Sequence, residues 1–112
     1  MQLDKRMVDT VTIVSLTGDL DARTAPAAQQ ELSDVIPDGT PVLLDLSNVG
    51  YVSSAGLRMM LMAYRKAQQS CTPIALVGVP DALRTILSAT GFLRFFDVAE
   101  TIPEAISALE SG

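Results

Sequence analysis

The sequence of 112 residues contains no histidine, no tryptophan and one cysteine, Cys71. Without imidazole the chain cannot form a Ser-His or Cys-His nucleophile pair, a zincin motif or a phosphohistidine. A single thiol cannot form an internal disulfide and is far short of a zinc ligand set, which favours a reducing compartment. The glycine-rich phosphate loops GxGxxG and GxxxxGK are also missing. These absences predict a protein that is not an enzyme and that holds no metal or cofactor.

Aromatic residues and positive charges are scarce as well. Three Phe and two Tyr leave an aliphatic core and no stacking platform for single-stranded nucleic acid. The chain has 8 basic and 13 acidic residues, a net charge of −5, whereas duplex nucleic acid and anionic membranes attract the opposite sign. The longest uncharged apolar run, residues 59–64, is much too short to span a bilayer. We therefore expect a cytoplasmic protein that binds neither nucleic acid nor a membrane.

The pattern of apolar residues and turn signals predicts one α/β domain over residues 1–112. The first two strands should pair as a hairpin, and the first helix should follow an N-cap at Thr24, because residues 18–23 break the strand pattern. The expected fold is a four- or five-stranded mixed sheet, parallel through its centre, with helices packed mainly on one side. Strands are expected over 3–7, 10–17, 41–47, 74–77 and 95–98, and helices over 25–36, 55–69, 80–90 and 103–109, with 37–39 ending the first helix.

The adjacent serines Ser53 and Ser54, just before the second predicted helix, are the most informative residues. A serine there can cap the helix, which is worth about 1 kcal/mol, but capping explains only one of the pair. A G-x-S-x-G nucleophile elbow is not complete, because Val52 replaces the first glycine and no histidine exists. The remaining interpretation is phosphorylation, since a phosphate on Ser54 would meet the free amides and positive end of the helix.

The helix after the serine pair combines an apolar stripe with a mixed face. At about 100° per residue, the inward stripe comprises Leu57, Met60, Leu61 and Tyr64. The residues expected outward or at the rim are Arg58, Met59, Met62, Arg65 and Lys66. Exposed methionine beside arginine is typical of adaptable interfaces, whereas the alternative is that Met59 and Met62 fill an aliphatic core.

Three motifs in register identify a resemblance to a known family. Residues 16–21 (LTGDLD) with Thr24 resemble the signature L-x-G-[DE]-L-D-x-x-T, and residues 43–47 (LLDLS) resemble a central strand with the pattern hydrophobic-D-L-S. Residues 51–58 (YVSSAGLR) resemble a phosphorylation loop with the pattern F/Y-[IM]-D-S-[ST]-G-L-G. The chain therefore resembles the STAS domain family, in particular the bacterial anti-sigma-factor antagonists, over nearly its whole length.

The resemblance implies that a kinase-type anti-sigma factor, which itself binds the ATP, phosphorylates Ser54, with Ser53 as the alternative acceptor. Ser53 stands where many members have Asp. Phosphorylation would release the partner, and a serine phosphatase is a second candidate partner. The partner-binding surface implied by the resemblance and the helix pattern comprises Asp21, Thr24, Ser53, Ala55, Gly56, Arg58, Met59 and Met62. The alternative is a STAS adaptor that is never phosphorylated and acts as a fixed scaffold in a signalling or lipid-transport complex.

Overall fold

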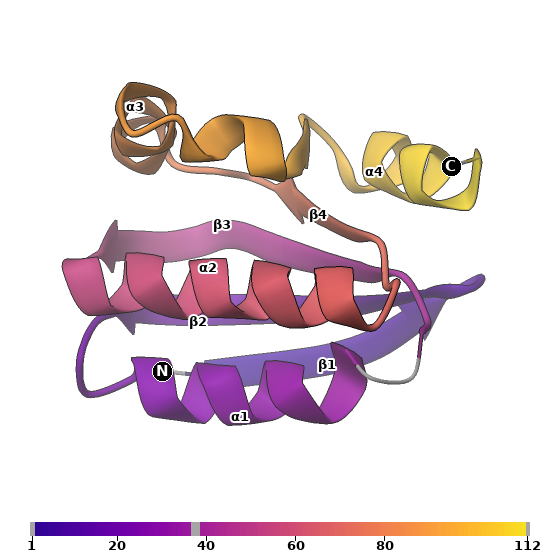
Figure 1. Cartoon of the computed structure of the whole chain (residues 1–112), viewed down its shortest axis with the longest axis horizontal. Coiled ribbons are helices and arrows are strands. Elements are labelled where there is room, and N and C mark those ends of the chain that lie inside the picture. Colours follow the sequence, from indigo (N-terminus) through magenta and orange to yellow (C-terminus); the bar gives the residue numbers. More distant parts are fainter. Residues whose placement is uncertain (1, 37–38, 112) are drawn as a thin grey trace.

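The computed structural model describes residues 2–36 and 39–111, and over these it forms a mixed five-stranded sheet flanked by four α-helices (Figure 1). The strands lie in sequence order and are β1 (Gln2–Val8), β2 (Val11–Leu20), β3 (Val42–Val52), β4 (Ile74–Val77) and β5 (Asp97–Ala99). The helices are α1 (Ala25–Val35), α2 (Ser54–Gln69), α3 (Asp81–Ala89) and α4 (Ile102–Ser111), with a short 3₁₀ helix η2 (Phe92–Phe95). Only β1 runs antiparallel to its neighbour. The predicted fold class is confirmed.

Two strands extend further than the sequence pattern indicated. The prediction that residues 18–23 break the strand is wrong for its first part, since β2 continues to Leu20 and β3 continues to Val52. β3 carries two extra residues relative to β2, because the register passes from Ser15↔Asp45 to Thr17↔Asn48 and later reaches Leu20↔Val52. Such bulges keep strands paired where the alternation of side chains is lost. Of the segment expected to end α1, residues 37 and 38 lie outside the described residues.

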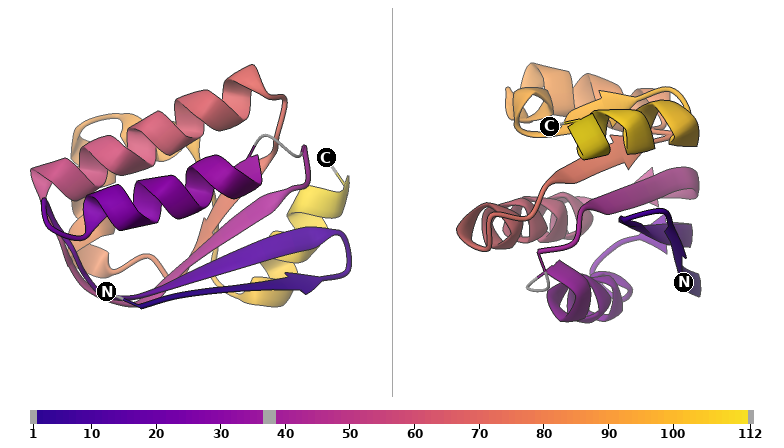
Figure 2. Two further views of the ribbon diagram at one scale, coloured as in Figure 1. Left: turned by 90° about the horizontal axis from the view of Figure 1, so that it is seen from below. Right: turned by 90° about the vertical axis from the view of Figure 1, so that its right-hand side faces the viewer.

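The sheet is covered on both faces, with α1, α2 and α3 on one face and α4 on the other (Figure 2). Adjacent residues of a strand point to opposite faces, so Leu44 packs toward α2 whereas Leu43 packs toward α4. This explains the unbroken apolar runs of β3 and β4, which are typical of strands buried on both sides. The face toward α4 is small and comprises Val11, Ile13, Leu43, Ala75, Val77, Ala105, Ile106 and Leu109.

The rotation of α2 differs from the predicted one, and the expectation that Met59 faces outward is wrong. Met59 is buried, with 2% of its surface exposed, as is Met60. α1 packs along the side of α2 (Figure 1), so the buried arc of α2 is wider than the stripe that faces the sheet. The buried residues of α2 are Gly56, Met59, Met60, Ala63 and Ala67, whereas Leu57, Leu61 and Tyr64 are partly buried at the rim.

Candidate functional site

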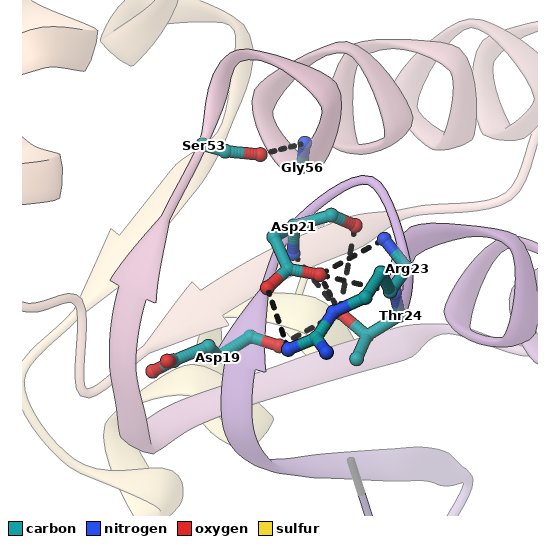
Figure 3. A network of polar contacts seen from close by, with 6 residues as sticks. All are labelled: Asp19, Asp21, Arg23, Thr24, Ser53 and Gly56. Atoms are coloured by element: carbon teal, nitrogen blue, oxygen red, sulfur yellow. Dashed lines mark hydrogen bonds and ion pairs between the residues drawn. The ribbon is translucent and has the colours of Figure 1, made fainter.

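Two segments meet at the carboxyl ends of β2 and β3. The first, residues 19–24, links β2 to α1 and is called the aspartate loop; the second, residues 53–56, begins α2 and is called the serine segment. In parallel sheets these strand ends are where binding sites gather, because each following helix presents its N-terminus there. Figure 3 shows the serine segment directly beside the aspartate loop. The sequence predictions for Asp21, Thr24 and the two serines therefore fall on one surface.

Hydrogen bonds within the aspartate loop hold it in a fixed shape (Figure 3). The Asp21 carboxylate accepts from the backbone N–H groups of Arg23 at 2.9 Å and Thr24 at 3.2 Å. The Thr24 hydroxyl donates to the Asp19 carbonyl at 2.7 Å and accepts from the Asp21 N–H at 2.9 Å. Thr24 occupies the N-cap position of α1, as predicted, but its side chain makes no capping hydrogen bond to the helix. Its hydroxyl is used within the loop, and the amides that the Asp21 carboxylate accepts, those of Arg23 and Thr24, precede the first residue of α1.

These contacts change the acidity of Asp21. The backbone N–H of Arg23 lowers the pKa of the Asp21 carboxyl below its ordinary value of 3.8, and the N–H of Thr24 and the Arg23 guanidinium act in the same direction. Partial desolvation of the carboxyl acts against them. Asp21 is therefore a carboxylate whose negative charge is bound into the loop, although its side chain is still 24% exposed.

Lowering the pH should reduce the contribution of Asp21 to the free energy of unfolding. Because the pKa of Asp21 is lowered on folding, its contribution to stability is complete above the unfolded value of 3.8 and is lost as the pH falls through the lower folded value. Asp21→Asn should therefore unfold at a lower urea concentration than wild type at about pH 7, and the difference in urea midpoint should narrow as the pH falls below 3.8. The measurement is the urea midpoint of both proteins across this range. A gap that does not change with pH contradicts the prediction.

The serine segment gives its two hydroxyls different surroundings. Ser53 is the N-cap of α2, and its hydroxyl oxygen accepts from the Gly56 N–H at 3.3 Å. Ser54 is the first residue of the helix and is exposed. Among residues 2–36 and 39–111, its hydroxyl has no hydrogen-bond partner. The capping role predicted for one serine thus belongs to Ser53, and the Ser54 side chain is left exposed.

Gly56 fixes the serine segment against the aspartate loop. Gly56, expected on the partner-binding surface, is buried, and a Cβ on it would lie 2.5 Å from the carbonyl oxygen of Leu20 and 2.9 Å from its Cγ. The same carbonyl accepts from the Ser53 N–H at 2.9 Å. Only glycine allows α2 to approach β2 this closely, so Gly56 sets the position of Ser53 and Ser54 against the aspartate loop.

Around Ser54 the surface combines exposed cations with exposed apolar side chains. Arg58 and Met62 are exposed on α2, as predicted. A groove of about 220 Å³ beside Ser54 was not predicted; it is bounded by Tyr51, which is 58% exposed, and by Ile86 of α3, which is 42% exposed. Ile86 lies off the buried stripe of α3 that Leu83 and Leu87 form. An apolar residue at such a position is the sequence signal that could have predicted this groove.

Metal ligation and membrane crossing find no support in the part of the chain that the structure describes. It contains no group of three or more Cys, Asp or Glu side chains that could hold a metal ion. None of its helices combines the length and the apolar composition needed to cross a lipid bilayer.

The fold and the site together define a class of protein: a small mixed α/β domain that presents a serine at the start of a helix beside a structured acidic loop. A family model described as "Mlab, STAS domain" matches residues 3–98 of the chain. The chain belongs to the STAS domain family.

Relatives of the chain carry consistent names. A Bordetella bronchiseptica protein described as a candidate anti-sigma factor antagonist, BtrV, is 30% identical over 113 residues, which cover 100% of this chain and 97% of the relative. The anti-sigma-B factor antagonist of Listeria monocytogenes is 26% identical over 99 residues, 88% of this chain and 86% of the relative. The crystal structure of an anti-sigma factor antagonist from Mycobacterium paratuberculosis superposes with a TM-score of 0.87 at 30% identity, covering 97% and 93% of the two chains.

Proposed function

We propose that this protein is an anti-sigma factor antagonist that binds a kinase-type anti-sigma factor while Ser54 is unmodified and is released when Ser54 is phosphorylated. The observation that carries the proposal is the position of Ser54, an exposed hydroxyl at the first residue of α2, on the surface shared with the aspartate loop. The names of the relatives, anti-sigma factor antagonists in each case, support the same partner class.

The role of this chain in the proposed switch is that of a substrate and a binding partner. In the transfer, Ser54 Oγ forms a bond to the γ-phosphorus of ATP held by the anti-sigma factor. The bond from that phosphorus to the bridging oxygen breaks, ADP leaves with the electron pair, and a base of the kinase takes the hydroxyl proton. A serine phosphatase would hydrolyse the ester and return the protein to its binding form. We place the cycle in the cytoplasm, where both ATP and sigma factors are found.

The structure favours Ser54 over Ser53 as the acceptor. The Ser53 oxygen is half-buried and accepts the Gly56 N–H, so moving it to a kinase would remove the cap of α2. Ser54 can be reached without breaking any hydrogen bond in the described part of the chain. The aspartate loop, including Asp21 and Thr24, would then contribute to the surrounding docking surface as a preformed shape.

The direct test is incubation with the cognate kinase-type anti-sigma factor and ATP, followed by mass spectrometry. Wild type should gain the mass of one phosphoryl group, and fragmentation should place it on Ser54. Ser54→Ala should gain none, whereas the matched variant Ser53→Ala should still be modified after circular dichroism has shown that it is folded. Equal modification of Ser54→Ala and wild type would overturn the assignment of the acceptor.

A second candidate function is that of an adaptor whose serine is never modified. The observation that supports it is the description of the matching family model as "Mlab, STAS domain". An adaptor would bind its partner equally well whether position 54 is Ser, Ala or Glu. The antagonist should lose binding only with Glu, so the same three proteins distinguish the two functions.

A further inference from the structure

Arg58 lies one helical turn after Ser54 and has no anionic partner in the described part of the chain. The ion pairs recorded there are Lys5–Glu31, Arg23–Asp21 and Arg84–Glu100. α2 itself contains no Asp or Glu between Ser54 and Gln69 that could pair with Arg58. In the neighbouring aspartate loop, the Asp21 carboxylate is already bound by two backbone amides and by Arg23. The Arg58 guanidinium is thus a free cation at the start of the helix.

The sequence makes Arg58 notable as well. In the loop pattern that residues 51–58 resemble, the residue before the acceptor is Asp and the last position is Gly, but here these positions are Ser53 and Arg58. The loop has therefore lost a negative charge next to Ser54 and gained a positive charge four residues after it. Both differences favour a dianion at position 54.

Helix geometry brings the two side chains together. Residues i and i+4 lie on the same face, about 5 to 6 Å apart at Cβ, and both Ser54 and Arg58 are exposed. Helical side chains lean toward the N-terminus, and the Arg58 side chain is long enough to reach back over the turn that contains Ser54. A negative group placed N-terminal to a positive one at this spacing is the favourable order. The backbone N–H groups of Ser54 and Ala55 also have no acceptor among the described residues.

We propose that Arg58 is the internal counter-ion of phosphorylated Ser54, which it binds through a charge-assisted, bidentate contact. This inference rests on the proposed function only in taking Ser54 as the acceptor. A phosphoserine of charge near −2 paired with this guanidinium changes the local charge from +1 to about −1. The partner then meets an anion where it had met a free guanidinium, so one modification both adds a repulsive group and removes an attractive one.

The test uses the full chain with phosphoserine placed at position 54 during synthesis, so no kinase is needed. Phosphorus NMR follows the second ionisation of the phosphate, which for free phosphoserine has a pKa of about 6. The pair should hold this pKa about half a pH unit lower, as an exposed charge-assisted contact does, and 1 M salt should reduce the shift. Arg58→Gln should raise the pKa toward 6, and Arg58→Lys should keep part of the shift.

The matched control is Arg65→Gln, an exposed arginine of the same helix that lies eleven residues after Ser54. It should leave the phosphate pKa at the wild-type value. Equal phosphate pKa values in wild type and Arg58→Gln, or an equal effect of Arg65→Gln, would overturn the pairing. Because the phosphoserine is placed during synthesis, the NMR measurement gives the same result whether or not a kinase modifies Ser54. Failure of the proposed function and failure of this inference are therefore separate results.

Discussion

Replacing Gly56 with alanine should lower the free energy of unfolding by about 1 to 3 kcal/mol. At an open helical position the same change stabilises by up to about 1 kcal/mol, so the expected sign is opposite to the intrinsic preference. The reason is the 2.5 Å between the new Cβ and the carbonyl oxygen of Leu20. That oxygen belongs to the backbone of a buried strand residue and cannot rotate away. Trimming the Leu20 side chain therefore cannot rescue the variant.

The damage should reach the functional site and not only the stability. The carbonyl that the new methyl displaces also accepts the Ser53 N–H, so separation of α2 from β2 breaks this hydrogen bond. Urea denaturation measures the loss of stability, and amide exchange should show faster exchange at Ser53. Ala55→Gly is the matched control: it loses helix propensity of about 1 kcal/mol but introduces no clash and should leave the Ser53 amide protected. A Gly56→Ala protein as stable as wild type would contradict this account of the glycine.

The sequence predicted the fold because its signals are local. The apolar runs at residues 41–47 and 74–77 predicted β3 and β4, and the serine pair before an amphipathic pattern predicted the start of α2 without deciding which serine caps it. The same local reasoning singled out Ser54 as the candidate acceptor, because capping accounts for one serine and leaves the other without a structural role. None of these inferences depends on which helices and strands pack against each other.

The predictions that were wrong concern features that tertiary contacts determine. Met59 is buried because α1 covers the side of α2, which the periodicity of α2 alone does not contain. Thr24 and Asp21 are both residue types that accept backbone N–H groups at the start of a helix. Which N–H groups each side chain accepts depends on the path of the aspartate loop. The close approach of Gly56 to the Leu20 carbonyl could not be predicted locally, because Leu20 is 36 residues earlier in the chain. The groove at Tyr51 and Ile86 likewise joins two elements that are distant in sequence.

Phosphorylation of Ser54 should weaken binding to the kinase-type anti-sigma factor by about 100-fold or more, which corresponds to about 2.7 kcal/mol. The phosphate adds a charge of about −1.5 to −2 to an exposed position on a protein whose net charge is already −5. The phosphate also lies on a surface that combines apolar side chains with the Arg58 guanidinium. Desolvating an anion there is costly, and the phosphate neutralises the positive charge of Arg58. The measurement is isothermal titration calorimetry with unmodified and phosphorylated protein.

The variants at position 54 separate charge from shape. Ser54→Ala should bind like unmodified wild type, because its exposed hydroxyl makes no hydrogen bond within the described residues, and Ser54→Glu should lose less than the phosphate does, since it adds one charge. Ser107→Glu adds the same charge on α4, on the opposite face of the sheet, and should leave the affinity unchanged. Raising the salt from 0.1 to 0.5 M should narrow the gap between the two states, because exposed charges are screened. If phosphorylated and unmodified protein bind equally, Ser54 is not a switch, and the adaptor function becomes the better account of this surface.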